Sequence, residues 1–240
     1  MVINIKDKNQ FIASYLRPIS ALTDAVILKT NDNKLECIAN NEQGLIVYAS
    51  YKLDVESDLV FNIPNIKKLE KILSFIEGDE IDLNYKENSL SYKDKKMRFK
   101  YHFLDDNIIQ APKLSVQKIM SLPHDVEFNM DSSKIGELAK GAAFVAESEK
   151  LYINISDGKV FAEITDRANS SVDSYSILIN ENAADVKEVS FPVHFDIVRL
   201  LGATNQIRIK VKINTEQGLS TFELQTEQTL LKYVVPGLQV

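Results

Sequence analysis

The chain contains two copies of one sequence pattern, and this repetition constrains its fold more than any other feature. VINIKDKNQFIASYL begins at Val2, and VEFNMDSSKIGELAK begins at Val126. Each reads as a short strand, an aspartate (Asp7 or Asp131) and an amphipathic helix, and aspartate is a preferred cap for a helix N-terminus. A pattern that returns in the same order predicts two structural repeats.

The following blocks of the two copies read as β-hairpins. They are ILKTNDNKLECIAN in the first copy and YINISDGKVFAEIT in the second. Asp32-Asn33 and Asp157-Gly158 stand at the expected turns, and these residue pairs suit the left-handed conformations of a two-residue hairpin loop.

A third pair of blocks, NIPNIKKLEKIL from Asn62 and SFPVHFDIVRLL from Ser190, predicts a second helix in each copy. Pro64 and Pro192 are expected in the first helical turn, where a missing N–H is tolerated. Strands follow in both copies (EIDLNYK and IRIKVKIN), and each copy ends on the dipeptide Lys-Tyr.

The repeats divide the chain into three segments. We expect an N-terminal repeat over residues 1–107, a connector over 108–125 and a C-terminal repeat over 126–240. Alternating apolar residues in segments such as LIVYASYKL and SVDSYSILI predict more strand than helix, with mostly antiparallel connections. The predicted fold class is therefore α+β.

The composition is that of a soluble globular protein, with 45% hydrophobic residues and a formal net charge of −6. This charge predicts no general affinity for nucleic acid. The only cysteine, Cys37, excludes an internal disulfide. The apolar segments are too short to span a membrane and the N-terminus lacks a secretory pattern, so we expect a cytoplasmic protein.

Cations nevertheless gather on the four predicted helices. Arg17 lies opposite the apolar face of the first helix, and Lys140 and Arg199 do so in the third and fourth. In the second helix Lys67 and Lys71 stand four residues apart, a like-charge spacing that costs a few tenths of a kcal/mol. One such face is ordinarily just solvated, but four in an acidic chain indicate a shared cationic surface.

Catalytic patterns are missing from the sequence. His102, His124 and His194 lack the paired spacing of a metal site, and no nucleophile elbow, P-loop or dinucleotide fingerprint occurs. We expect no enzymatic activity, no metal and no cofactor, although an enzyme without a recognisable motif stays an alternative.

The repeats, the connector, the charge placement and the ending YVVPGL (residues 233–238) together resemble the DNA polymerase sliding clamps of the two-domain kind. That group includes proliferating-cell nuclear antigen and the clamps of T-even-type bacteriophages, and the short chain favours a phage clamp. The resemblance implies a homotrimeric ring of six repeats, with sheets outside and helices lining a hole for duplex DNA. It also implies a processivity factor that tethers a DNA polymerase, is opened by an ATP-dependent clamp loader and works in the host cytoplasm if phage-encoded.

The resemblance assigns three sets of residues. The DNA-facing set is Arg17, Lys67, Lys68, Lys71, Lys134, Lys140 and Arg199. The subunit-interface set is Phe99, Tyr101, Tyr175, Ile177 and Leu178. The partner-peptide groove is Leu45, Val47, Ile108, Ile109, Leu114, Val234, Val235 and Pro236. For the interface and groove residues an alternative carries equal weight: each of them packs in the core of its own repeat.

Two further expectations concern function. Lys67 and Lys68 correspond to Phe195 and Asp196 in the second copy, so the second repeat should hold phosphate less well than the first. The alternative function is a non-catalytic one: a subunit of a clamp-like hetero-ring, or a phage structural protein.

Overall fold

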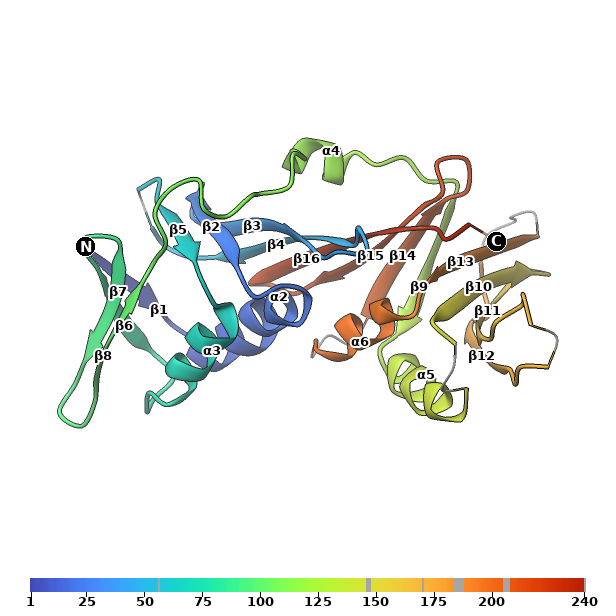
Figure 1. Cartoon of the computed structure of the whole chain (residues 1–240), viewed down its shortest axis with the longest axis horizontal. Coiled ribbons are helices and arrows are strands. Elements are labelled where there is room, and N and C mark those ends of the chain that lie inside the picture. Colours follow the sequence, from blue (N-terminus) through green and yellow to red (C-terminus); the bar gives the residue numbers. More distant parts are fainter. Residues whose placement is uncertain (56, 146–147, 170, 184–187, 205–207, 240) are drawn as a thin grey trace. The chain divides into compact units, whose positions relative to one another are not determined.

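The computed structural model describes residues 1–55, 57–145, 148–169, 171–183, 188–204 and 208–239. It divides into two units (Figure 1), which are described separately. Unit 1 comprises Met1–Glu42, Ile46–Ile119 and Gln225–Leu231, and unit 2 comprises Gln43–Leu45, Met120–Leu224 and Lys232–Val240.

The first eight strands belong to unit 1: β1 (Val2–Ile5), β2 (Val26–Asn31), β3 (Lys34–Asn40), β4 (Ile46–Lys52), β5 (Val60–Ile63), β6 (Ile81–Tyr85), β7 (Ser89–Lys93) and β8 (Arg98–His102). Its first helix is continuous over α1 (Lys8–Phe11), the π-helical turn η1 (Ile12–Leu16) and α2 (Arg17–Leu22), and its second is α3 (Ile66–Ser74). The short helix α4 (Val116–Met120) lies in the connecting segment.

The remaining elements follow in the same order: β9 (Val126–Asp131), α5 (Ser133–Phe144), β10 (Lys150–Ser156), β11 (Lys159–Ile164), β12 (Tyr175–Asn180), β13 (Val189–His194), α6 (Asp196–Gly202), β14 (Arg208–Asn214), β15 (Leu219–Gln225) and β16 (Thr229–Pro236). Of these, β16 is shared, because its first three residues belong to unit 1 and the rest to unit 2.

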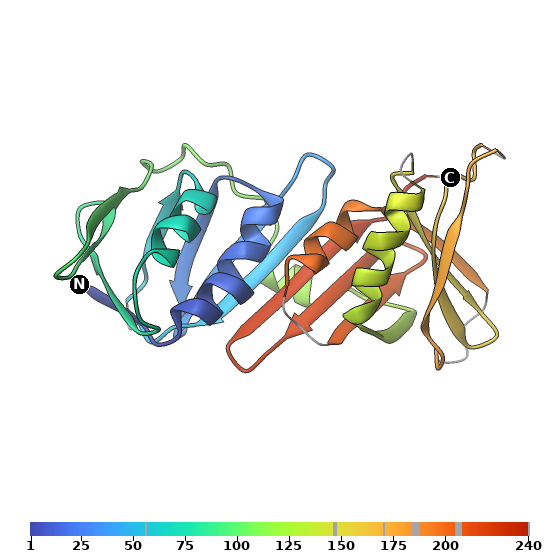
Figure 2. The same ribbon diagram turned by 90° about the horizontal axis from the view of Figure 1, so that it is seen from below.

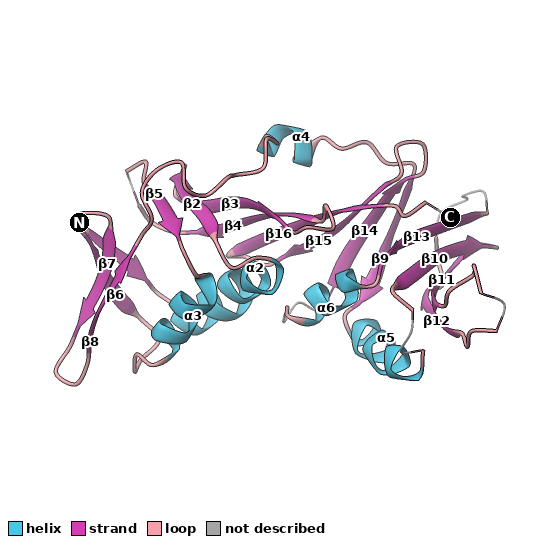
Figure 3. Ribbon diagram, in the orientation of Figure 1, coloured by secondary structure: helices cyan, strands magenta, loops and turns pink. Residues whose placement is uncertain are grey.

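Sheet topology repeats along the chain. Unit 1 has the strand orders β1-β6-β7-β8 and β5-β2-β3-β4, and unit 2 has the corresponding orders β9-β14-β15-β16 and β13-β10-β11-β12. Neighbours such as β3 and β4, or β10 and β11, run antiparallel. The predicted repeat and the α+β class are therefore confirmed (Figure 3).

Both predicted hairpin turns are present. Asp32 and Asn33 have φ of 48° and 56°, and Asp157 and Gly158 have φ of 50° and 72°. Consecutive left-handed residues match the right-handed twist of the flanking strands.

The predicted placement of the prolines is wrong. Pro64 precedes the N-cap residue Asn65, and α3 begins only at Ile66. Pro192 lies inside β13, which is the outer strand in the order β12-β11-β10-β13. A proline is tolerated there because its missing N–H falls on the strand edge, and its carbonyl accepts the Leu238 N–H at 2.9 Å.

The helices of each unit lie against each other on one face of its sheets, as Figure 2 shows for α2 with α3 and for α5 with α6. In α3 the predicted apolar stripe of Ile66, Leu69 and Leu73 is buried, and its polar face is exposed. Burying these stripes against the sheets is the main term that stabilises such layers.

Helix α5 carries two glycines in different surroundings. A Cβ added at Gly136 would meet nothing within 4 Å, whereas a Cβ at Gly141 would lie 2.1 Å from Cδ1 of Tyr175. The bare backbone at Gly141 is therefore what seats the Tyr175 ring, and with it the start of β12, under this helix.

We expect the substitutions Gly136→Ala and Gly141→Ala to have opposite effects on the free energy of unfolding. Gly136→Ala should stabilise by up to about 1 kcal/mol, because alanine is the better helix former. Gly141→Ala should destabilise by about 1–3 kcal/mol through overpacking. Chemical denaturation followed by circular dichroism measures both.

A Tyr175→Ala background provides the control. Without the ring, Gly141→Ala should become as favourable as Gly136→Ala, and a loss of stability that persists in this background would contradict the packing explanation.

Candidate nucleic-acid interface

Helix α3 presents three cations on its exposed face. The Asn65 side chain caps this helix, since its Oδ1 accepts the Lys68 N–H at 2.8 Å. Lys67 is paired with Asp24 at 3.0 Å, whereas Lys68 and Lys71 form no ion pair with any residue that the structure describes. Their ammonium groups are therefore available to an external anion.

Arg17, on the neighbouring helix, is held differently. Its Nε donates to Glu70 Oε1 at 3.0 Å, and Glu70 belongs to α3. This contact joins the two helices of unit 1 across their polar faces.

Unit 2 has a sparser set of cations. Lys134 pairs with Glu137 at 3.0 Å, and Arg199 pairs with Asp196 at 2.8 Å. Lys140 is exposed and forms no ion pair within the described part of the chain. Such surface pairs are weak, about 0–1 kcal/mol, so a phosphate can displace the carboxylate.

The two units thus differ in charge on their helix faces. The helices of unit 1 carry Arg17, Lys67, Lys68 and Lys71 at the surface against one acid, Glu70. The helices of unit 2 carry three cations against two acids, Glu137 and Asp196. The sequence pattern located all seven cations on helices but did not reveal which of them are paired. Two of the four partners, Glu70 and Asp24, are distant in sequence from their cations.

Among the described residues, no group of three or more His, Cys, Asp or Glu is placed to hold a metal ion. Cys37 is buried, and burial raises the pKa of its thiol to about 12, so it is protonated at neutral pH. Over the same residues, no helix combines the length and apolarity needed to cross a bilayer.

Strands β8 and β12 are the outer strands of their sheets, and the described residues add no further strand beside either. The edge of β4, by contrast, is bordered within unit 1 by residues 225–231, where the Lys52 N–H donates to the Gln228 carbonyl at 2.8 Å. By the repeat, β4 corresponds to β12 and β16 corresponds to β8.

The five residues predicted for the interface lie on these two strands but differ in exposure. Phe99 is half-buried and stacks on Tyr92, with ring centroids 6.0 Å apart. Tyr101 is buried, and its hydroxyl donates to the Asn65 carbonyl at 2.7 Å, so it supports the start of α3 in its own unit. Tyr175, Ile177 and Leu178 are half-buried on β12.

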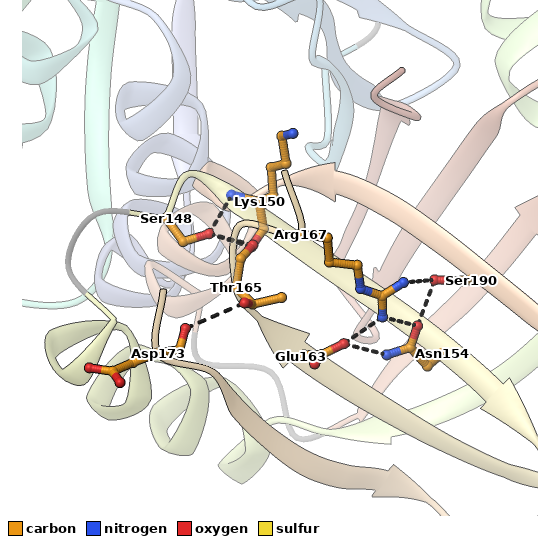
Figure 4. Close-up of polar contacts among 8 residues, drawn as sticks. All are labelled: Ser148, Lys150, Asn154, Glu163, Thr165, Arg167, Asp173 and Ser190. Carbon is orange, nitrogen blue, oxygen red and sulfur yellow. Dashed lines mark hydrogen bonds and ion pairs between the residues drawn. The ribbon is translucent and has the colours of Figure 1, made fainter. Parts of the chain in front are cut away.

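A polar network anchors the loop that leads into β12 (Figure 4). The Arg167 guanidinium donates to Ser190 Oγ at 2.8 Å on β13 and to Asn154 Oδ1 at 3.0 Å on β10, and it pairs with Glu163 on β11. It also stacks over the Tyr152 ring at 4.0 Å. Sequence reasoning missed this residue, since its partners lie on three different strands.

Two exposed phenylalanines lie at the ends of helices, one in each unit. Phe75 is 62% exposed at the end of α3, beside the segment in which Glu77 pairs with Lys96 of the β7–β8 hairpin at 2.7 Å. Phe144 is 66% exposed at the end of α5, the helix that packs on β12. The sequence analysis did not single out either residue.

A pocket of about 480 Å³ lies within unit 1, between the connecting segment and the sheet face opposite the helices. Its walls are residues 111, 112 and 114–116 of the connector together with strands β2 to β5. Tyr48 donates to Glu36 Oε1 at 2.5 Å in this pocket, and burial together with this hydrogen bond raises the pKa of Tyr48.

The structure places one predicted groove residue, Leu114, in this pocket. Val47, Leu45 and Val235 are fully buried, whereas Ile108 is 58% exposed. The others are Ile109 and Pro236, which are half-buried, and Val234, which is buried. Glu36 and Tyr48 were missed, although their alternation in the strands places them on the outward face.

Comparisons with known proteins agree with this topology. A scan of protein-family models and a search of curated proteins both find no match. Among solved structures, the proliferating cellular nuclear antigen of Entamoeba histolytica superposes with a TM-score of 0.77 at 15% identity, covering 99% of this chain and 98% of that one.

Two archaeal structures are similarly close. The A. fulgidus PCNA bound to the C-terminal region of FEN-1 has a TM-score of 0.78 at 12% identity, covering 100% of this chain and 98% of that one. A PCNA2–PCNA3 complex from Sulfolobus tokodaii has a TM-score of 0.75 at 10% identity, covering 99% of both chains. The chain therefore has the PCNA-like sliding-clamp fold, as the sequence resemblance predicted.

Removing the cap of α3 should destabilise the helix that carries three of the seven cations. We expect Asn65→Ala to lower the free energy of unfolding by about 1 kcal/mol, because the Lys68 N–H loses its acceptor. The matched control is Ser132→Ala at the N-cap of α5, whose side chain makes no capping hydrogen bond. Equal effects of the two substitutions, measured by urea denaturation, would contradict this assignment.

Proposed function

We propose that this protein is a sliding clamp, a non-catalytic processivity factor that closes around duplex DNA as a head-to-tail homotrimer and tethers a DNA polymerase. The observation that carries the proposal is that β8 and β12 are outer strands with open edges, at the places that β16 and β4 occupy in the other repeat.

Repeat symmetry indicates what would cover these edges. Within unit 1, residues 225–231 border β4, and the last three of them are the start of β16. Since β12 corresponds to β4 and β8 to β16, the β8 of a second copy is the natural neighbour for β12. Such an association uses two different surfaces, and heterologous interfaces of this kind generate rings when the rotation closes.

The helix cations supply the binding surface for DNA in this proposal. Lys68, Lys71 and Lys140 are unpaired among the described residues, and each of the remaining cations is paired with a single carboxylate. Phosphate contacts from lysine and arginine carry no sequence information and permit sliding along the duplex. The larger cationic surplus of unit 1 supports the expectation that the first repeat contributes more to DNA binding than the second.

The pocket beside the connector is the candidate docking site for partners. Its apolar wall contains Leu114, Ile38 and Val60, and Glu36, Tyr48 and Lys29 supply polar groups. A preformed groove of this kind binds a short peptide through a few anchors. We assign it to peptides of the polymerase and of an ATP-dependent clamp loader, which must open the ring.

A second candidate is a subunit of a hetero-ring. The similar S. tokodaii structure is a complex of two different clamp chains, PCNA2 and PCNA3. In that case β8 and β12 would pair with different partners, and the chain alone would not form a closed ring.

Charge reversal tests the DNA surface. We expect Lys71→Glu to weaken binding to a labelled duplex at low salt, and the slope of log K against log salt should fall by about 0.9 for each phosphate that the variant no longer neutralises. Lys93→Glu, on strand β7, makes the same change of charge away from the helices and should have a much smaller effect. Equal weakening by the two variants, measured by fluorescence anisotropy, would exclude a specific cationic lining.

The exposed phenylalanines test the ring interface. Phe75 and Phe144 are large exposed apolar side chains at helix ends, and the helix of Phe144 packs on β12. We assign both to the head-to-tail interface, where burying one such side chain is worth about 1.5–3 kcal/mol. We expect Phe144→Asp to raise the dissociation constant for self-association at least tenfold, as measured by analytical ultracentrifugation. Met120→Asp, on the 45% exposed Met120 of α4, is the control, and an equal effect there would contradict this interface.

A further inference from the structure

The contact between Arg17 and Glu70 differs from the Lys134–Glu137 and Arg199–Asp196 pairs, because it joins two different helices. A serine hydroxyl also anchors the Glu70 carboxylate. Arg17 Nε lies 3.0 Å from Glu70 Oε1, and the Ser20 hydroxyl lies 3.0 Å from Oε2 of the same carboxylate. Glu70 is 19% exposed, whereas Arg17 is 49% exposed. A largely buried acid thus holds a largely exposed guanidinium.

The backbone of the first helix places Arg17 for this contact. Its N–H donates to the Ile12 carbonyl five residues earlier, which closes the π-helical turn η1. A widened turn accommodates Pro18, which would otherwise clash with the preceding turn of a regular helix. Ser14, in the same turn, bonds the Gln10 carbonyl at 2.7 Å and Thr229 Oγ1 at 2.8 Å, so this segment is tied to its surroundings.

The Ser20 hydroxyl connects the backbone and the carboxylate. It lies 2.9 Å from the Arg17 carbonyl as well as 3.0 Å from Glu70, so its single proton is shared between two acceptors. Its buried position fixes one oxygen of Glu70 and leaves the other for Arg17.

Glu70 contacts one of the three guanidinium nitrogens of Arg17, and the other two are left for a ligand. Only Nε is engaged, and the two terminal nitrogens, with four N–H groups, have no partner among the residues the structure describes. Arg199 and Arg167, by contrast, engage terminal nitrogens in their ion pairs with Asp196 and Glu163. The free terminal edge of Arg17 matches the two non-bridging oxygens of a phosphodiester.

We infer that Glu70 and Ser20 are positioning residues, which hold the terminal edge of Arg17 ready for a backbone phosphate of the nucleic acid. The inference rests on the proposed function, since it names the ligand chemistry of that same surface. It also explains why an acid occurs on the helix face of unit 1: Glu70 orients a cation there.

Two substitutions at Glu70 separate its charge from its role as an acceptor. Glu70→Gln and Glu70→Met remove the same negative charge, but only glutamine keeps an oxygen that can accept from Arg17 Nε. We expect Glu70→Gln to bind duplex DNA at least as tightly as the wild type, because a repulsive charge is gone. Glu70→Met should bind about two- to fivefold more weakly than Glu70→Gln, which is the range of a single exposed pair.

Fluorescence anisotropy with a labelled duplex across a salt series measures both affinity and salt slope. The slope should fall for Arg17→Gln and for Glu70→Met but remain at the wild-type value for Glu70→Gln. In an Arg17→Gln background the two Glu70 variants should become indistinguishable. Equal affinities of Glu70→Gln and Glu70→Met with Arg17 present would overturn the inference.

Ser20→Ala provides a second variant that leaves every charge in place. Ser20→Ala should weaken DNA binding, as Glu70→Met does. Thermal melting of each variant checks that the fold is retained. If Ser20→Ala and both Glu70 variants all bind as the wild type does, the positioning role is excluded.

The control Lys71→Glu keeps this test distinct from that of the proposed function. If Lys71→Glu weakens DNA binding while Glu70→Gln and Glu70→Met bind DNA with equal affinity, only the positioning role is excluded. When neither Lys71→Glu nor Arg17→Gln alters binding, the proposed DNA surface fails, and the inference fails with it.

Discussion

The unpaired backbone edges of β8 and β12 are the constraint on which the functional account depends. Edge strands expose rows of N–H and C=O groups, and proteins shorten, charge or cover such edges because they otherwise pair with other chains. Arg98 and Lys100 place charge on β8, but β12 carries only uncharged side chains, with three of them apolar. The Arg167 network and the close approach of Tyr175 to Gly141 hold this apolar edge, and in the proposed function it receives a partner strand.

The helices of unit 1 concentrate positive charge in a chain that is negatively charged as a whole. The chain is acidic overall, yet the exposed faces of α2 and α3 carry four cations against one acid. Two of the other three helix cations, Lys134 and Arg199, are held in weak ion pairs, and in the proposed function a phosphate replaces the carboxylate. A surface of this type binds the regular charge of a duplex without selecting a sequence, which is what movement along DNA requires.

Much of the fold could be predicted from the sequence because the deciding signals are local. The two hairpins follow from residue pairs that tolerate positive φ, and the stripe Ile66, Leu69 and Leu73 follows from helical spacing. Each of these local patterns occurs in both repeats, so each predicted element is supported by two segments of the sequence. The placement of Pro192 failed for the opposite reason, since the same residue suits a helix start and an outer strand equally well. Only the hydrogen bonding of the folded chain distinguishes those cases.

The site was predictable in outline but not in its pairing. Helical spacing located the seven cations, whereas the contacts of Arg17 with Glu70 and of Lys67 with Asp24 join residues that only packing brings together. The π-helical turn before Pro18 has no simple sequence signature either.

The most direct measurement of the central claim is the mass in solution, by light scattering over a concentration series. The account predicts a species of three times 27.1 kDa, or 81.3 kDa, that dissociates only on dilution. A mass that stays at 27.1 kDa across the whole series would contradict a ring made from this chain alone.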